Sequence, residues 1–222
     1  VALTVPDARA AHARARALLA EGHDQPARPG ELAIPAIRGV GGSIIRLLDT
    51  ASDLGRLWEV DFRSEPAGPG AGLVAVDHLG QTMAYDAMLS WALFYTTIFD
   101  AAKAPMVDVA DPDGLVRIFA TAAALADRGF PVLRIGDNYY ADVEARFGLD
   151  PTLLARMRAA SILYDEDAGG QFFQMYSAAQ PGGLFFEIVQ RQGNYQGYGA
   201  PNAPFRIAAQ KRNAAPAGIP RR

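Results

Sequence analysis

The sequence predicts an α+β protein built from repeated βαβββ modules. One observation behind this prediction is the order of elements: strand, helix and then strands recur along the chain with a period of roughly 50–60 residues. The other is a shared helix ending, since "RALLAEG" (16–22) and "AALADRG" (123–129) close two predicted helices in the same way. Repeated modules of this kind bury one face of a small sheet under a helix.

The first unit begins with a short strand, "VALTV", and continues with a helix over residues 7–22. Asp7 is the predicted N-cap, because its carboxylate can accept a hydrogen bond from the first turn, and Gly22 is the predicted stop. Two strands around a Gly-Gly turn follow in "ELAIPAIRGVGGSIIRLLD" (31–49).

The second unit is predicted to open with the strand "GLVAVDHLG" (72–80) and to continue with an amphipathic helix over residues 85–101. The apolar face of that helix is expected to bury Met88, Trp91, Tyr95 and Ile98. Between the two units, "RSEPAGPGAG" (63–72) is rich in proline and glycine and is the predicted domain boundary.

The last part of the chain is predicted to hold two helices and four strands. The helices cover residues 118–129 and 150–160, the second with Asp150 as cap and Pro151 at its first position. The strands are "FPVLRIG" (130–136), "SILYD" (161–165), "QFFQMYS" (171–177) and "LFFEIVQR" (184–191).

Composition excludes several classes of protein. The 222 residues are 50% hydrophobic and 20% charged, with a net charge of −3 and no cysteine. This charge gives no basic surface for nucleic acid, and the absence of cysteine rules out disulfides and thiolate metal sites. Since the sequence shows no apolar run of a membrane span's length and no signal peptide, we expect a soluble cytoplasmic protein without a nucleic-acid or membrane partner.

Glu187 stands inside the apolar run "LFFEIVQ" (184–190), where a carboxylate is unexpected. Alternation along a strand places it on the face opposite to Phe186. A buried carboxylate needs an ion-pair partner, a cation or a proton, because an isolated buried charge is costly. Glu187 is therefore interpreted as a metal ligand or as the partner of an arginine such as Arg134 or Arg191.

Among the three histidines, only His78 ends a predicted apolar strand. His12 lies on an arginine-rich helix face and His23 in a loop, and both are interpreted as surface residues. His78 is either a satisfied structural histidine or a metal ligand. Because imidazole and carboxylate with open positions suit divalent iron and similar metals, His78 and Glu187 together indicate an incomplete metal site.

Gln174 in "QFFQMYS" is a further candidate. Its amide either binds a polar substrate or lies on the solvent-exposed face of a hairpin, and the residues alone favour the second interpretation. The segment "GNYQGYGAPNAPF" (193–205) follows the strand of Glu187 and is either a lid over a pocket or an irregular connection.

Several stretches of the chain carry a resemblance to a known family. They are "ELAIPAIRGVGGSIIRLLD", "VAVDHLG" with "FYTTIFD", "DNYYADVEARFGLD", "ILYDEDAGGQFFQMYS" and "LFFEIVQRQGNYQGYGAPN", and they cover most of residues 1–210. These stretches resemble 4-hydroxyphenylpyruvate dioxygenase, of the vicinal oxygen chelate (glyoxalase-like) superfamily. They also resemble the dioxygenase-like, C-terminal part of bacterial fusion proteins whose N-terminal barrel is a 3-dehydroshikimate dehydratase.

The resemblance implies a domain plan. Residues 1–66 would be the second module of an N-terminal, metal-free domain. Residues 67–200 would form the C-terminal metal-binding domain of two modules, and residues 201–222 the C-terminal segment and tail.

The resemblance also implies the chemistry: Fe(II) or another divalent metal, held by two histidines and a glutamate, acting on an aromatic 2-oxo acid or a related hydroxy or oxo acid. His78 would be the first metal ligand and Glu187 the last. The residues that would contact the substrate are Gln174, Tyr198, Asn202 and Phe205. The alternative function is a catalytically silent module that supports a fused 3-dehydroshikimate dehydratase, and a homo-oligomer is left open.

The chain is also predicted to lack an internal stretch between Arg117 and Ile118. The helix that starts at Ile118 follows "DPDGLVR", which offers no opening strand, and too few residues after Ala101 remain to supply three strands. By resemblance, the opening strand that is missing carries the second metal histidine.

Overall fold

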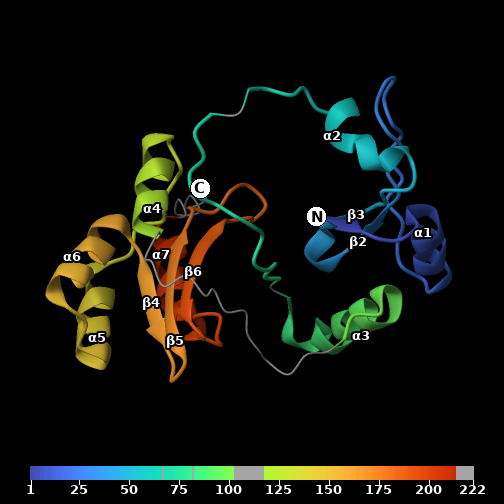
Figure 1. Cartoon of the computed structure of the whole chain (residues 1–222). Helices are drawn as coiled ribbons and strands as arrows, with labels where there is room; N and C mark the ends of the chain where they lie inside the picture. Colours follow the sequence, from blue (N-terminus) through green and yellow to red (C-terminus); the bar gives the residue numbers. More distant parts are fainter. Residues whose placement is uncertain (67, 82, 103–117, 214–222) are drawn as a thin grey trace, which may run out of the picture. The chain divides into compact units, whose positions relative to one another are not determined.

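In a computed structural model of the chain, the described residues are 1–66, 68–81, 83–102 and 118–213. They fall into two compact units, Val1–Gly68 with His78–Ala104 and Pro69–Asp77 with Pro105–Arg222 (Figure 1). Each unit combines a three-stranded sheet with helices, and the predicted α+β class is confirmed. No helix among the described residues is long and apolar enough to cross a membrane.

The first unit contains the predicted strand, helix and strand pair. Strand β1 (Ala2–Thr4) precedes helix α1 (Ala8–Ala17), and β2 (Ala36–Arg38) and β3 (Ile44–Leu48) follow. The sheet order is β1-β3-β2, with β1 parallel to β3 and β2 antiparallel to it. A 3-10 turn, η1 (Val40–Gly42), makes the predicted Gly-Gly connection. After β3 come the short elements η2 (Asp53–Arg56) and α2 (Leu57–Val60).

Helix α1 begins where the sequence predicts and ends earlier. The Asp7 carboxylate accepts a hydrogen bond from the Ala10 amide at 2.8 Å, as an N-cap does. The predicted stop at Gly22 is wrong. Leu19 takes the left-handed conformation (φ 67°), so that the Ala20 amide donates to the Ala15 carbonyl and closes the helix. A leucine in the left-handed conformation is rare, and sequence rules therefore place the end of the helix at the nearest glycine.

Asp49 anchors the N-terminus of α1 from the end of β3. Its Oδ2 accepts from the Ala8 amide at 2.9 Å, and its Oδ1 accepts from the Ser52 amide at 2.7 Å. These hydrogen bonds, that of Ala8 first, lower the pKa of the Asp49 carboxyl below its usual value of 3.8. The ionised Asp49 carboxylate therefore stabilises the folded state relative to the unfolded state.

We expect Asp49→Asn to lower the thermal midpoint at pH 7, with a difference from wild type that shrinks as the pH falls below about 4. A carboxyl whose folded pKa is depressed stabilises the fold above its unfolded pKa, and this contribution is lost as the pH falls through the folded pKa. Midpoints measured by circular dichroism between pH 2.5 and pH 7 check the result. Asp24→Asn, at an exposed position, is the control; an Asp49→Asn deficit that stays constant over this range would contradict the linkage.

The predicted strand at residues 72–80 is wrong, since no strand forms there. Its apolar side chains are open to solvent, with Val74 92% and Val76 82% exposed. A strand needs a neighbouring ladder to satisfy its backbone groups, and none of the described strands pairs with this segment. The alternating pattern is present in the sequence, but the described part of the chain supplies no neighbouring strand for it.

The predicted helix at 85–101 forms as η3 (Tyr85–Ala87) followed by α3 (Met88–Phe99). Ile98 is buried as expected, whereas Met88 is 48% exposed, so the predicted apolar face is only partly covered. In the first unit α3 packs against α1, and the Arg14 guanidinium donates to the Thr97 carbonyl at 2.9 Å.

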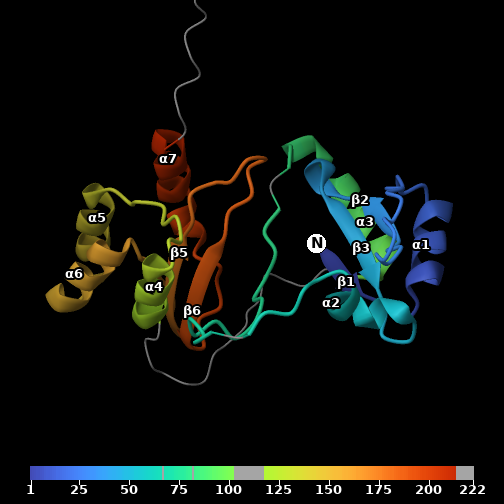
Figure 2. The ribbon, with the colours of Figure 1, turned by 90° about the horizontal axis from the view of Figure 1, so that it is seen from above.

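The second unit has three helices followed by three antiparallel strands and a C-terminal helix. The helices are α4 (Ile118–Asp127), α5 (Asp137–Phe147) and α6 (Pro151–Ala160), the strands are β4 (Leu163–Glu166), β5 (Gly170–Tyr176) and β6 (Glu187–Gly193), and the chain continues through η4 (Ala200–Asn202) into α7 (Ala203–Asn213). The sheet order is β4-β5-β6. Figure 2 shows α5 and α6 as a layer beside this sheet.

The main differences from the sequence prediction in this unit lie before the sheet. The predicted strand 130–136 is reduced to one bridge between Val132 and Ser177, although Leu133 is fully buried. Helix α5 was not predicted. The cap of α6 forms as expected, because the Asp150 carboxylate accepts from the amides of Thr152 and Leu153.

Candidate functional site

The faces of β5 and β6 decide which side chains can meet. Antiparallel pairing places Glu187 opposite Tyr176, Val189 opposite Gln174, and Arg191 opposite Phe172. Because alternate residues of a strand share a face, these six side chains lie on one side of the sheet. The other side carries Phe173 and is covered by helices. The ring centre of Phe173 lies 6.4 Å from that of Phe119 on α4.

Glu187 is half-buried and lies at the centre of a polar group on the first face. Its Oε1 accepts hydrogen bonds from the Gln174 amide nitrogen at 2.7 Å and from the Tyr176 hydroxyl at 3.0 Å. Burial, followed by the charge of Glu187, raises the pKa of Tyr176 well above the ordinary tyrosine value. Tyr176 therefore stays protonated at neutral pH and donates to the carboxylate.

Gln174 is fully buried, so the interpretation favoured by the residues alone, a place on the solvent-exposed face of a hairpin, is wrong. Its Nε2 also lies 3.1 Å from the Tyr198 carbonyl oxygen, which can only accept. A carbonyl and a carboxylate on the same side fix the amide orientation: Nε2 faces Glu187 and Tyr198, and Oε1 faces Asn202. The amide is thereby held in one orientation beside the glutamate.

Asn202 completes the group from the C-terminal segment. It is fully buried, and its Nδ2 donates to Gln174 Oε1 at 2.7 Å and to the Tyr164 carbonyl at 3.1 Å. Its Oδ1 accepts from the Tyr139 hydroxyl at 3.0 Å. Gly199, three residues earlier, is left-handed (φ 59°) and leaves no room for a side chain, because an added Cβ would lie 2.2 Å from Gln174 Oε1.

The four predicted substrate residues are therefore only partly brought together. Gln174 and Asn202 form a hydrogen bond with each other, and Tyr198, a residue that is 40% exposed, contributes its backbone carbonyl. The ring of Phe205 packs edge-on against that of Tyr139, with 4.9 Å between the ring centres, and it is a partly buried neighbour of the hydrophobic core.

The described residues do not complete a metal site. No group of three His, Cys, Asp or Glu side chains comes together among them. His78 is half-buried and is the first residue of His78–Ala104, the second of the two stretches that make up the first unit. Glu187 belongs to the second unit. The hydrogen bonds to Glu187 are of the kind that orient a ligand carboxylate, so this side chain by itself fits the role of a metal ligand. The described donor set as a whole does not fit a metal site, because it lacks a group of three such side chains.

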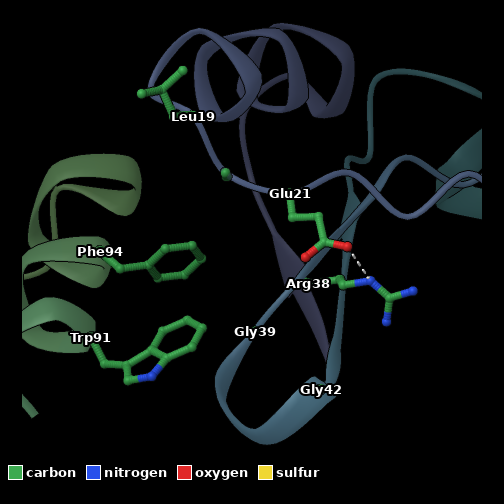
Figure 3. A pocket seen from close by; sticks show the side chains of 8 residues that line it. Leu19, Glu21, Arg38, Gly39, Gly42, Trp91 and Phe94 are labelled. Carbon is green, nitrogen blue, oxygen red and sulfur yellow. Dashed lines mark ion pairs between the residues drawn. The ribbon is translucent and has the colours of Figure 1, made fainter. Parts of the chain in front are cut away.

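The open pocket drawn in Figure 3 lies in the first unit and contains none of the predicted site residues. It has a volume of about 370 Å³ and lies between the end of α1, the β2–β3 turn and α3. Trp91 and Phe94 point into it from α3, and the Glu21–Arg38 ion pair, at 2.8 Å, stands opposite. The sheet face of Glu187 is a better candidate site, because its polar groups are buried and mutually oriented, whereas this ion pair is largely exposed.

Sequence reasoning missed two polar participants on and around the sheet. Tyr176 was recognisable from alternation, since it shares the face of Glu187. Tyr139 was not, because its hydroxyl reaches the Tyr164 backbone from a helix that was not predicted. Arg191, named as a partner for Glu187, forms an ion pair with Asp77.

Comparison with known proteins gives a family context. Residues 1–63 match the family described as "Hydroxyphenylpyruvate dioxygenase, HPPD, N-terminal". A solved structure titled "xylose isomerase-like TIM barrel/4-hydroxyphenylpyruvate dioxygenase fusion protein" is 30% identical, has a TM-score of 0.72, and aligns with 96% of this chain and 41% of its own. The chain is thus similar to 4-hydroxyphenylpyruvate dioxygenase and to this fusion protein, and the predicted resemblance is confirmed.

Curated relatives carry two different names. The "3-dehydroshikimate dehydratase" of Pseudomonas aeruginosa is 32% identical over 256 residues, which cover 94% of this chain and 40% of that protein. The "4-hydroxyphenylpyruvate dioxygenase" of the same organism is 27% identical over 225 residues, which cover 78% of this chain and 62% of that protein. This chain thus spans well under half of the dehydratase. The 256 aligned residues also exceed the 222 of this chain, so the dehydratase holds residues that have no counterpart here.

Proposed function

We propose that this 4-hydroxyphenylpyruvate dioxygenase-like chain is a non-haem metal protein for an aromatic 2-oxo acid or a related hydroxy or oxo acid. Glu187 and His78 are two of its metal ligands, and the metal is Fe(II) or another divalent cation. The observation that carries the proposal is the fixed amide of Gln174 beside Glu187, since donors that hold a carboxylate in one orientation are what a ligand needs. The metal supplies Lewis acidity and oxygen chemistry when bound.

The protein's own groups have separate roles in this proposal. Gln174 and Asn202 form one rigid amide pair, and through it the C-terminal segment is tied to the Glu187 face. Tyr198 is the exposed aromatic of that segment and lines the substrate side, whereas the ring of Phe205 packs against Tyr139. The Tyr176 hydroxyl, kept protonated by burial and by Glu187, holds a hydrogen bond to the carboxylate.

The third ligand is proposed to lie in a stretch that this sequence lacks between residues 117 and 118. Arg117 is outside the described residues. Two observations support the proposal: the alignment that is longer than this chain, and the segment 72–80, which has the pattern of a strand but no partner among the described strands. We place the protein in the cytoplasm as part of a bifunctional protein of aromatic metabolism.

A second candidate function is a catalytically silent module that supports a fused 3-dehydroshikimate dehydratase. The observation in its favour is the incomplete donor set, since no group of three potential ligands gathers in the described part of the chain. The two dehydratase relatives, at 32% and 31% identity, point the same way.

Glu187→Gln is expected to lower metal affinity by at least tenfold and to leave the fold intact. The carbonyl oxygen of glutamine can accept the same bonds from Gln174 and Tyr176, but a neutral amide is a poorer ligand for a hard cation. Anaerobic titration with Co(II), followed by visible absorption, measures the affinity, and circular dichroism measures the fold. Unchanged metal binding together with a sharp loss of stability would identify Glu187 as an ion-pair partner.

Wild type and Glu187→Gln are compared in two forms of the protein. One is the 222-residue chain, and the other carries the extra residues of the Pseudomonas aeruginosa relative between Arg117 and Ile118. We expect tighter Co(II) binding in the longer form. Oxygen uptake with Fe(II) and 4-hydroxyphenylpyruvate in that form supports the enzyme, whereas metal binding without oxygen uptake by any aromatic 2-oxo acid supports the silent module.

A further inference from the structure

The open pocket of the first unit has two walls of different chemistry. Trp91 and Phe94 of α3 form an aromatic wall, and their ring centres lie 5.1 Å apart in an edge-to-face arrangement. Glu21 and Arg38 form a polar wall opposite these rings (Figure 3). The volume of about 370 Å³ falls in the ordinary range for a small-molecule site, and every residue that lines the pocket belongs to the first unit.

The aromatic wall is held in place by the core of the same unit. Ile98, one turn after Phe94 on α3, is 8% exposed and belongs to the hydrophobic core that α1 and β3 also form, and Phe94 packs against this core. The Arg14 guanidinium of α1 donates to the Thr97 carbonyl at 2.9 Å. The two rings are therefore fixed beside the end of α1 by contacts within one unit.

The polar wall is fixed by the backbone. The Arg38 amide donates to the Glu21 carbonyl at 2.8 Å, and the neighbouring residues Gly22 and Ile37 form an antiparallel bridge. The Arg38 Nε then donates to Glu21 Oε1 at 2.8 Å, which uses one oxygen of the carboxylate. A carboxylate has two oxygens with several acceptor sites, so Glu21 keeps acceptor capacity for a second cation. In the view of Figure 3 the carboxylate lies between the rings and the guanidinium, so that Glu21 faces the aromatic wall.

Leu19 is unusual in two ways where it lines this pocket. Its backbone is left-handed (φ 67°), a conformation that a side chain disfavours, and the residue is 92% exposed. A glycine would end α1 at this position without the strain. Strained backbone clusters at ligand-binding sites, and an apolar side chain left open beside a cavity provides a surface that a ligand can cover.

We propose that this pocket binds a small organic ammonium ion. The face of an aromatic ring attracts a cation, and the Glu21 carboxylate supplies the opposite charge across the cavity. The carbon substituents of the ammonium group bury apolar surface against Leu19 and the rings. An anion held by Arg38 fits the pocket less well, because the negative ring faces of the opposite wall repel it.

The binding is expected to be weak, in the millimolar range, since Glu21 is 72% exposed and already pairs with Arg38. The proposal is independent of the metal proposal, because none of the proposed metal-binding or substrate-binding residues lines this pocket.

The test uses choline as the probe and Trp91 as the reporter. Trp58 is 70% exposed, and Trp58→Phe leaves Trp91 as the only tryptophan of the chain. Choline chloride replaces sodium chloride at constant ionic strength, so that charge screening does not change. We expect saturable changes in the Trp91 emission and in its indole N–H resonance. The neutral isostere of choline, in which a tert-butyl group replaces the trimethylammonium group, should bind about fivefold more weakly.

Three variants in this background test the separate parts of the pocket. Glu21→Gln keeps the size of the side chain and removes its charge, and should weaken choline binding about fivefold without affecting the neutral isostere. Phe94→Leu should weaken choline more than the isostere, because leucine has no ring face for a cation. Leu19→Gly should raise the thermal midpoint by relieving the backbone and yet weaken both ligands, since it removes apolar surface from the pocket.

Glu59→Gln is the matched control, because Glu59 is similarly exposed (71%) and also pairs with the Nε of an arginine, Arg56 at 3.2 Å. It should change neither affinity. Equal binding of choline and its isostere would overturn the recognition of charge. Tighter binding of benzoate than of choline would overturn the proposal in favour of an anion site on Arg38, and the absence of a saturable change in both Trp91 signals would overturn the site itself.

Discussion

Replacing Gly199 with alanine is expected to cost about 3 kcal/mol of unfolding free energy and to disturb the amide of Gln174. Part of this cost comes from the left-handed backbone, which at φ 59° disfavours any residue with a Cβ by about 1–2 kcal/mol. The rest comes from overpacking, because the new methyl group would lie 2.2 Å from Gln174 Oε1. Gln174 cannot swing away without breaking its bonds to Asn202 and Glu187.

Gly148→Ala separates the two contributions. Gly148 ends α5 with nearly the same backbone angle, φ 58°, and an added Cβ meets nothing within 4 Å. We expect this variant to lose only the backbone part, about 1 kcal/mol. Chemical denaturation of both variants gives the two free energies, and the Gln174 side-chain amide resonances show whether the site moved. Equal losses, with Gln174 unshifted in both, would mean that the site tolerates the methyl group.

The sheet face of the candidate site could be predicted from local pattern alone. Alternation along "LFFEIVQR" and "QFFQMYS" places Glu187 and Gln174 on strands whose pairing follows from short turns. Three strands of the second unit and the caps of α1 and α6 form near their predicted positions for the same reason. Each depends on interactions between residues close in the sequence.

The features that the sequence did not reveal depend on distant partners. Gln174 is buried only because Gly199 and Asn202 fold back over it, which no periodicity in "QFFQMYS" indicates. Residues 72–80 show the opposite case, in which a correct strand pattern stays irregular because its partner is absent from the described sheets. Helix α5 is an exception, because it was not predicted although its signals are local: Tyr139 and Val143 lie one turn apart, and Gly148 ends the helix.

Asn202→Ala is expected to destabilise the protein by roughly 2–4 kcal/mol, the range for breaking a buried polar network. Asn202 is fully buried and bonds three different residues at once. Truncation leaves Gln174 Oε1 without this donor, and the Tyr139 hydroxyl keeps only its bonds to the Tyr164 backbone. A small cavity adds to the loss, because the surrounding sheet and helix cannot collapse onto the space.

A double-mutant cycle tests whether these groups act as one network. Tyr139→Phe removes a single hydroxyl, and its cost should depend on whether Asn202 is present, with a coupling of about 1 kcal/mol or more. Asn202→Ala is also expected to free the Gln174 amide and so to weaken Co(II) binding at Glu187, although Asn202 contacts no proposed ligand. Additive free energies and unchanged metal affinity would show that Asn202 only fills space. Coupled energies with weaker binding would show that the C-terminal segment sets the orientation of the carboxylate through the chain Asn202–Gln174–Glu187.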